Sequence, residues 1–170
     1  MKRVMAIVCL AAITSSAKGL TEISYQDEQI ICMAQNIYHE ARGDNYAGQL
    51  AVADVVLNRV ADPRYPDTIC GVVKQAKLSK WWLERGKEVP VKNQCQFSWY
   101  CDGKSDDTSN ERAWNQSLAI SYSMITTGIY AGVSDGATHY HATYVDPYWA
   151  SSNQMTLIGP IGDHIFYRRK

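Results

Sequence analysis

The chain has 170 residues, of which 46% are hydrophobic and 20% are charged, so it can bury one core and is unlike a disordered chain. Lys and Arg number 17, as do Asp and Glu, and this balance argues against a protein that grips nucleic acid by its phosphates. The 11 Tyr and 5 Trp outnumber the 2 Phe, which suits either a sugar-binding surface or a core with a wet rim.

The first residues have the pattern of a secretory signal peptide. Met1-Lys2-Arg3 is basic, Val4 to Ile13 is apolar or small, and small residues precede a cleavage point after Ala17. An uncleaved anchor is the alternative, but the apolar stretch falls short of the roughly 18–20 residues that span a bilayer. We therefore predict that residues 1–17 are a leader and that the mature protein is exported, to the periplasm or the extracellular space, without a stable membrane anchor.

Apolar residues at helical spacing predict a first helix from Asp27 to Arg42. Its stripe consists of Ile30, Ala34, Ile37 and Ala41. Gly43 is expected to end this helix as a left-handed residue. A second helix is predicted from Tyr46 to Val60, with Asp44 or Asn45 as its cap.

The middle of the chain is predicted to hold a short helix, an irregular stretch and a further long helix. Thr68 begins the short helix, which runs to Ala76, and residues 77–108 are expected to be irregular. Thr108 and Glu111 have the spacing of a capping box, and Gly128 is expected to end the helix that they open.

Two strands are predicted near the C-terminus. Ala137 to Val145 is rich in Thr, Tyr and Val, and Ile161 to Arg168 is its expected antiparallel partner. The pattern as a whole predicts a mostly helical α+β domain with a small antiparallel β-hairpin near the C-terminus.

Four cysteines remain once the leader is removed: Cys32, Cys70, Cys95 and Cys101. An even number in an exported chain favours two disulfides, although three pairings are possible and the sequence does not choose among them. A zinc site is the alternative, but the chain has no C-x-x-C pair and the spacings are irregular.

Glu40 is the first candidate for chemistry. It lies in the last turn of the first predicted helix, where the negative end of the helix dipole opposes ionisation. Partial burial would raise its pKa further, toward the range that is useful for a general acid. The alternative is a solvated glutamate paired with a neighbouring arginine.

A second candidate site lies between Cys95 and Cys101. The residues that offer rings, amides or hydroxyls there are Gln96, Phe97, Ser98, Trp99 and Tyr100. Such a loop can form a sugar-binding wall, since pyranose rings stack on aromatic faces and hydroxyls bond to Gln and Ser. It could equally be a surface loop with Phe97 and Trp99 buried. No G-x-S-x-G turn surrounds Ser98, so a serine nucleophile is not supported.

The third candidate is a histidine pair on the first predicted strand. His139 and His141 alternate with Tyr140 and so share one face of the strand. With Glu40 or His164 they could imitate a zinc hydrolase, but no H-E-x-x-H spacing is present. A hydrogen-bonded pair at a sheet edge is the simpler alternative, and we expect neither metal nor cofactor.

Taken together, these motifs resemble the SleB-like cell wall hydrolases, the spore cortex-lytic enzymes and their relatives. The segments that carry the resemblance are Asn36–Gly43, Gly48–Ala53, Val55–Val60, Cys95–Trp99, Cys101–Gly103, Ala137–Ala142 with Pro147 and Trp149, and Ile161–Tyr167. They are in order and cover roughly residues 30–168, which is nearly the whole mature chain.

The resemblance implies a lysozyme-like fold of the lytic-transglycosylase type, with a linker at 18–28 and one catalytic domain at 29–170. It implies cleavage of peptidoglycan glycan strands at the β-1,4 bond between N-acetylmuramic acid and N-acetylglucosamine. The family's catalytic glutamate falls on Glu40. The family's other matching positions, expected around the glycan groove, are Gln96, Phe97, Ser98, Trp99, Tyr140 and His141. Spore members carry a separate wall-binding domain, so here the catalytic domain is expected to hold the substrate itself.

The number of catalytic acids bears on the mechanism. Hydrolysis of a glycosidic bond needs a second carboxylate at a set distance, and Asp44, Asp54 and Asp102 have no context that singles one out. A lytic transglycosylase needs none, because the muramyl C6 hydroxyl can attack, with Glu40 as acid and then as base. We therefore favour transglycosylation. The alternatives are ordinary hydrolysis, a zinc-dependent wall amidase or peptidase, and a non-catalytic wall-binding module.

Overall fold

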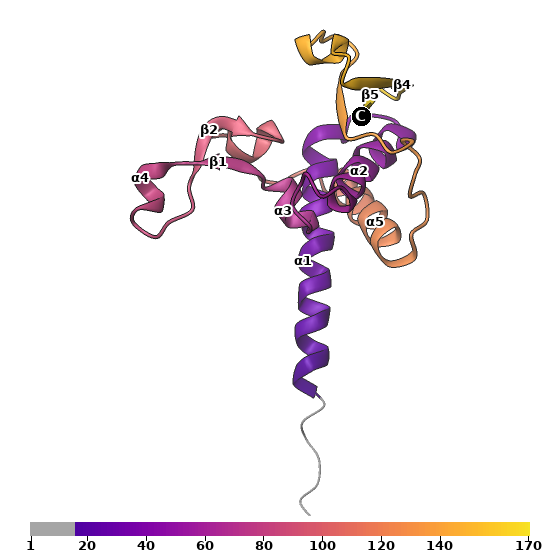
Figure 1. The fold of residues 1–170 in the computed structure, drawn as a ribbon. Coiled ribbons are helices and arrows are strands. Elements are labelled where there is room, and N and C mark those ends of the chain that lie inside the picture. Colours follow the sequence, from indigo (N-terminus) through magenta and orange to yellow (C-terminus); the bar gives the residue numbers. More distant parts are fainter. Residues whose placement is uncertain (1–15) are drawn as a thin grey trace, which may run out of the picture.

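The computed structural model describes the backbone of residues 16–170 and the side chains from residue 25 onward (Figure 1). The predicted leader therefore lies outside the described residues, apart from Ser16 and Ala17. The helices are α1 Ser16–Ala41, α2 Tyr46–Ala61, α3 Ile69–Val73, α4 Lys80–Leu83 and α5 Glu111–Thr127, with 3₁₀ turns η1 Ser98–Cys101 and η2 Tyr148–Ser151. The strands are β1 Ala76–Leu78, β2 Pro90–Cys95, β3 His139–Ala142, β4 Met155–Ile161 and β5 His164–Arg169. Among the described helices, none is both long enough and apolar enough to cross a membrane.

Helix α2 is the centre of the molecule. Every residue from Gly48 to Val56 is buried, as expected of a helix that is covered on all sides. One hydrophobic cluster joins α2 to α1, α3 and α5, through residues such as Ile37, Val56 and Ile120. A second cluster joins the opposite side of α2 to the C-terminal sheet, where Phe166 packs against it.

The helix ends differ from the sequence predictions in four places. Helix α3 ends at Val73 and not at Ala76, because Ala76 is the first residue of β1 and pairs with Cys95. Helix α1 begins at Ser16 and not near Asp27, so it includes the predicted linker, because no proline interrupts the segment. Gly43 does not adopt the left-handed conformation, and the chain leaves α1 through a bond from the Asp44 N–H to the carbonyl of Ala41. Thr108 does not cap α5. The cap is Asn110, and the hydroxyl of Tyr38 on α1 holds it there by accepting its N–H.

The remaining caps agree with the predictions. Asn45 caps α2 by accepting the N–H of Gly48, and Thr68 caps α3 by accepting that of Gly71. Gly128 ends α5 in the left-handed conformation, with φ of 69°.

The C-terminal sheet has three antiparallel strands in the order β3-β5-β4. The predicted pairing is confirmed in its centre, where Tyr140 of β3 lies opposite Phe166 of β5. A hairpin near the C-terminus is present, but it joins β4 to β5 through Gly162 and Asp163, and the sequence analysis missed β4. Gly159 and Pro160 are unfavourable within a strand, but β4 lies at the edge of the sheet and accommodates them with a register shift between Leu157 and Gly159.

The stretch predicted to be irregular contains an ordered arm. Strands β1 and β2 pair antiparallel, α4 lies between them, and Figure 1 shows this unit projecting from the helical body. The signal was weak because β1 has only three residues and β2 begins with Pro90.

The described part of the chain contains two disulfides, and they give the pairing that the sequence left open. Cys32 on α1 bonds to Cys70 on α3, with 38 residues of sequence separation. Cys95 bonds to Cys101 across a separation of 6 and closes the base of the arm onto η1. Disulfides form and persist in oxidising compartments, so this pairing fits an exported chain.

We expect the two disulfides to stabilise the fold unequally. Removal of the Cys32–Cys70 bond as Cys32→Ala with Cys70→Ala should lower the free energy of unfolding by about 3–4 kcal/mol, since it closes the longer loop. The matched pair Cys95→Ala with Cys101→Ala should cost about 2 kcal/mol. Urea denaturation without reductant measures both, and equal losses would contradict the loop-length argument.

Candidate active site

A cavity of about 530 Å³ opens beside the C-terminal end of α1. Its walls come from the last turn of α1, from η1 with the loop that follows it, and from β3 with the loop that follows β3. The predicted site residues that line it are Glu40, Ser98, Trp99, Tyr140 and His141. Segments far apart in the sequence therefore meet around one carboxyl group.

Glu40 is largely withdrawn from water in this cavity. Burial raises the pKa of its carboxyl above the usual value of 4.5. Three neighbours act in the opposite direction: a hydrogen bond from Tyr140, then the charges of His164 and Arg59. The Tyr140 hydroxyl donates to Glu40 Oε2 at 3.1 Å. Burial also raises the pKa of Tyr140 well above 10, so this hydroxyl keeps the proton that it donates.

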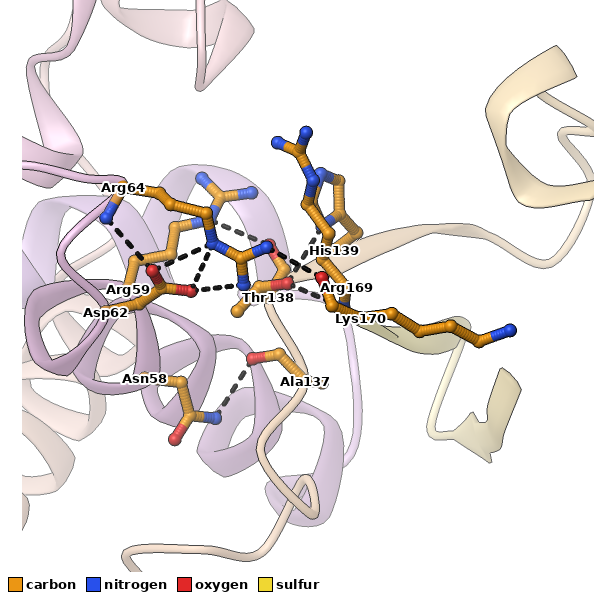
Figure 2. Close-up of polar contacts among 9 residues, drawn as sticks. All are labelled: Asn58, Arg59, Asp62, Arg64, Ala137, Thr138, His139, Arg169 and Lys170. Atoms are coloured by element: carbon orange, nitrogen blue, oxygen red, sulfur yellow. Dashed lines mark hydrogen bonds and ion pairs between the residues drawn. The ribbon is translucent and has the colours of Figure 1, made fainter. Parts of the chain in front are cut away.

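The C-terminal part of α2 positions Tyr140. Asn58 Nδ2 donates to the carbonyl of Ala137 at 2.9 Å, and Arg59 Nε donates to that of Thr138 at 2.8 Å (Figure 2). These two carbonyls immediately precede β3. Their bonds fix where β3 begins, and hence where the Tyr140 side chain meets Glu40.

Arg59 also places a positive charge close enough to Glu40 to lower the pKa of its carboxyl. Arg59 is only 5% exposed, and its Nη1 has no hydrogen-bond partner among the described residues. The guanidinium carbon lies 5.1 Å from the ring centre of Phe97 and 5.4 Å from that of Tyr65. Phe97 is accordingly a core residue under Arg59 and does not line the cavity.

Trp99 forms part of one wall. Its ring stacks on His39 with 4.6 Å between ring centres, and its Nε1 donates to Asn36 Oδ1. His39, which the sequence analysis did not select, lines the cavity next to Glu40. Gln96 is exposed and lies outside the cavity lining; its backbone N–H bonds to the carbonyl of Gln75.

The histidines do not converge on one point. His139 and His141 share a face of β3, where both rings contact Trp149, and His141 Nε2 bonds to the hydroxyl of Tyr167. Burial and nearby arginines lower the pKa of His139 to about 4. His164 instead contacts Asp44, with 3.1 Å between Nδ1 and Oδ2. The described residues contain no group of three His, Cys, Asp or Glu side chains placed to hold a metal ion.

Two of the three candidate second acids have structural roles. Asp54 is buried and accepts bonds from the N–H of Gly132 and from the N–H and hydroxyl of Ser134. Asp44 accepts from the Asp163 N–H as well as from His164.

Asp102 is the candidate that lines the cavity, together with Asp106 and Asp107 from the same loop. The sequence analysis named Asp102 as one of three possible second acids but did not select Asp106 or Asp107, because an acidic loop has no periodicity that would show which way it faces.

Comparisons with known proteins agree with this picture. The family model described as Cell Wall Hydrolase matches residues 43–167, beginning just after Glu40. A spore cortex-lytic enzyme of Halalkalibacterium halodurans is 53% identical over 49 residues, which are 29% of this chain and 15% of that relative. The chain thus spans a small part of that longer protein.

Two solved structures are similar over most of their length. The catalytic domain of the Bacillus cereus SleB protein has a TM-score of 0.54 and 29% identity, covering 84% of this chain and 91% of that one. The catalytic domain of a germination-specific lytic transglycosylase from Bacillus anthracis has a TM-score of 0.53 and 29% identity, over 81% and 92%. The predicted fold class and family resemblance are confirmed.

The raised pKa of Glu40 predicts a pH-dependent difference in stability. Folding favours the protonated carboxyl, so its contribution is complete below pH 4.5 and is lost as pH rises through the higher folded pKa. The Glu40→Gln variant has no carboxyl to ionise at this position, so it does not lose stability in this way as pH rises. The variant should therefore gain stability relative to the parent as pH is raised from 4 to 8, in urea unfolding at each pH. A pH-independent difference, or the same trend in the exposed control Glu88→Gln, would contradict burial of Glu40.

Proposed function

The chain belongs to the cell wall hydrolase family, and we propose that it cleaves peptidoglycan at the β-1,4 bond between N-acetylmuramic acid and N-acetylglucosamine, as a lytic transglycosylase. The proposal depends on one observation: the Glu40 carboxyl is largely buried in a cavity and accepts a hydrogen bond from the Tyr140 hydroxyl. The name of the similar Bacillus anthracis domain supports the reaction type.

The first step of the proposed reaction uses the protonated form of Glu40. Cleavage of a glycosidic bond requires a proton on the leaving oxygen while positive charge develops at the sugar carbon. Burial holds Glu40 in the protonated state at a higher pH than an exposed carboxyl. Glu40 would thus donate the proton as the bond breaks.

The second step uses the carboxylate that the first step leaves behind. The muramyl C6 hydroxyl attacks the sugar carbon, Glu40 takes the hydroxyl proton, and a 1,6-anhydro end forms. Burial alone would make this carboxylate costly, but the Tyr140 hydroxyl and the charge of Arg59 stabilise it. The same contacts thus allow one group to alternate between acid and base.

Ordinary hydrolysis is the second candidate, because acidic residues line the same cavity. Asp102, Asp106 and Asp107 come from the loop after η1, on the wall that carries Trp99. A carboxylate at the right distance from Glu40 could activate water and give a reducing end in place of the anhydro end. The product therefore separates the two reactions.

We assign the proposed substrate contacts by their place in the cavity. Ser98, Trp99, Tyr140 and His141 line it and would contact the glycan, whereas Phe97 would act through its packing against Arg59. Gln96 lies outside the lining, so we give it no direct contact. We place the enzyme in the periplasm or outside the cell, where its disulfides are stable and peptidoglycan is accessible.

We expect Glu40→Gln to abolish release of muropeptides from purified sacculi, because glutamine cannot transfer the proton. Mass spectrometry of products of the parent protein should show anhydro ends, lighter by one water than hydrolysis products. EDTA should leave turnover unchanged. Residual cleavage by Glu40→Gln would remove Glu40 from its role, reducing ends alone would establish hydrolysis, and loss of activity in EDTA would favour the zinc-dependent alternative.

Tyr140→Phe should shift the pH–rate profile. Without the hydroxyl the pKa of Glu40 rises further, so the alkaline limb moves to higher pH. The maximal rate should fall by about tenfold to a hundredfold, since the carboxylate of the second step loses a charge-assisted bond. Tyr167→Phe is the matched control, because its hydroxyl bonds to His141. An equal shift in both variants would contradict the role of Tyr140.

A further inference from the structure

The arm formed by β1, α4 and β2 ends in exposed aromatic and apolar side chains. Trp81 is 53% exposed and Leu83 is 44% exposed, both on α4 at the far end of the arm (Figure 1). Neither hydrophobic cluster of the described chain includes a residue between 76 and 94. The arm therefore does not contribute its side chains to the core.

The arm is also the basic part of a chain that is neutral overall. Residues 76–95 contain five basic and two acidic side chains, a net charge of +3, so the rest of the chain carries −3. The basic residues are Lys77, Lys80, Arg85, Lys87 and Lys92. By contrast, the loop that follows η1 places Asp102, Asp106 and Asp107 in the lining of the cavity. We call it the groove loop. The positive charges that would attract an anionic polymer are therefore those of the arm.

At the tip of the arm, two cationic side chains each lie near an indole ring. The Arg85 guanidinium carbon lies 3.8 Å from the ring centre of Trp81, and Lys87 Nζ lies 5.1 Å from that of Trp82. Arg85 Nη1 also donates to the carbonyl of Trp81 at 2.7 Å. These contacts hold the rings and the charges in place before any ligand arrives.

The base of the arm is continuous with the cavity that contains Glu40. The Cys95–Cys101 disulfide joins β2 to η1, and Trp99 of η1 lines the cavity. Lys92 lies over the groove loop: its Nζ is 3.3 Å from the position that a β-carbon on Gly103 would occupy. A polymer leaving the cavity over this wall would run along the basic arm.

We propose that the arm is a second binding surface for the peptidoglycan strand that occupies the cavity. The open part of Trp81 would stack on a sugar ring, and Lys80, Arg85 and Lys87 would pair with the free carboxylates of the stem peptides. This proposal rests on the proposed function. Peptidoglycan fits better than an anionic membrane, because the base of the arm is joined by the Cys95–Cys101 disulfide to η1, whose Trp99 lines the cavity.

Cosedimentation of the full chain with insoluble sacculi tests the proposal, using Glu40→Gln protein so that the sacculi stay intact. Adding Trp81→Ala should weaken binding about three- to tenfold. A second variant carries Lys80→Gln, Arg85→Gln and Lys87→Gln in place of Trp81→Ala. At low salt these three substitutions should weaken binding to sacculi as much as Trp81→Ala does, and at high salt their effect should be smaller. Tyr122→Ala, an equally exposed aromatic on α5, is the control for the first variant. Arg112→Gln with Arg168→Gln and Lys170→Gln is the control for the second.

Turnover separates this surface from the catalytic groove. In the background with Glu40 intact, Trp81→Ala should slow digestion of sacculi and leave cleavage of a short glycan without stem peptides unchanged. Unchanged sacculus binding by both arm variants, or equal losses in the controls, would overturn the proposal. Binding to phosphatidylglycerol vesicles that Trp81→Ala abolishes, with sacculus binding intact, would assign the arm to membranes instead. If the parent protein releases no muropeptides, the proposed function fails independently of these binding results.

Discussion

The site depends on the contact between the Glu40 carboxyl and the Tyr140 hydroxyl. A carboxyl taken out of water keeps its proton, which suits an acid, but it must also lose that proton to act as a base. Burial and the hydrogen bond from Tyr140 act in opposite directions on the pKa of Glu40, and the charge of Arg59 also lowers this pKa. The chemistry we propose requires both effects in one cavity.

The precision of that contact comes from α2. Three polar side chains hold the C-terminal third of the chain. One lies just before α2, one in its middle and one near its end. Asp44 binds the β4–β5 turn and His164, Asp54 binds the loop around Ser134, and Arg59 binds the carbonyl that precedes His139. Each is well removed from solvent and hydrogen-bonded, so loss of any one would leave its partners unsatisfied. The sheet therefore has little freedom to shift Tyr140 away from Glu40.

Charge is distributed unevenly over the molecule, and in the two proposals this separates catalysis from attachment. The cavity is lined by Glu40 and an acidic loop, while the cations of the arm lie outside the core and contact indole rings. A similar domain from a longer relative, such as the spore cortex-lytic enzyme of Halalkalibacterium halodurans, is accompanied by further sequence. In the described chain, an arm built into the catalytic domain offers one physical means of holding an extended polymer.

The sequence by itself indicated the long helices and the family, and it selected Glu40 as the candidate acid. Long apolar stripes and caps such as Asn45 and Gly128 are local signals, because they act within a few residues of the backbone that they stabilise. Only the tertiary structure decided the disulfide pairing, the strand β4, the arm and the roles of the three aspartates. Asp54 and Asp102 look alike in sequence, yet one is buried against Ser134 and the other lines the cavity. Such roles depend on groups dozens of residues away, and no local pattern records which of them folding will bring together.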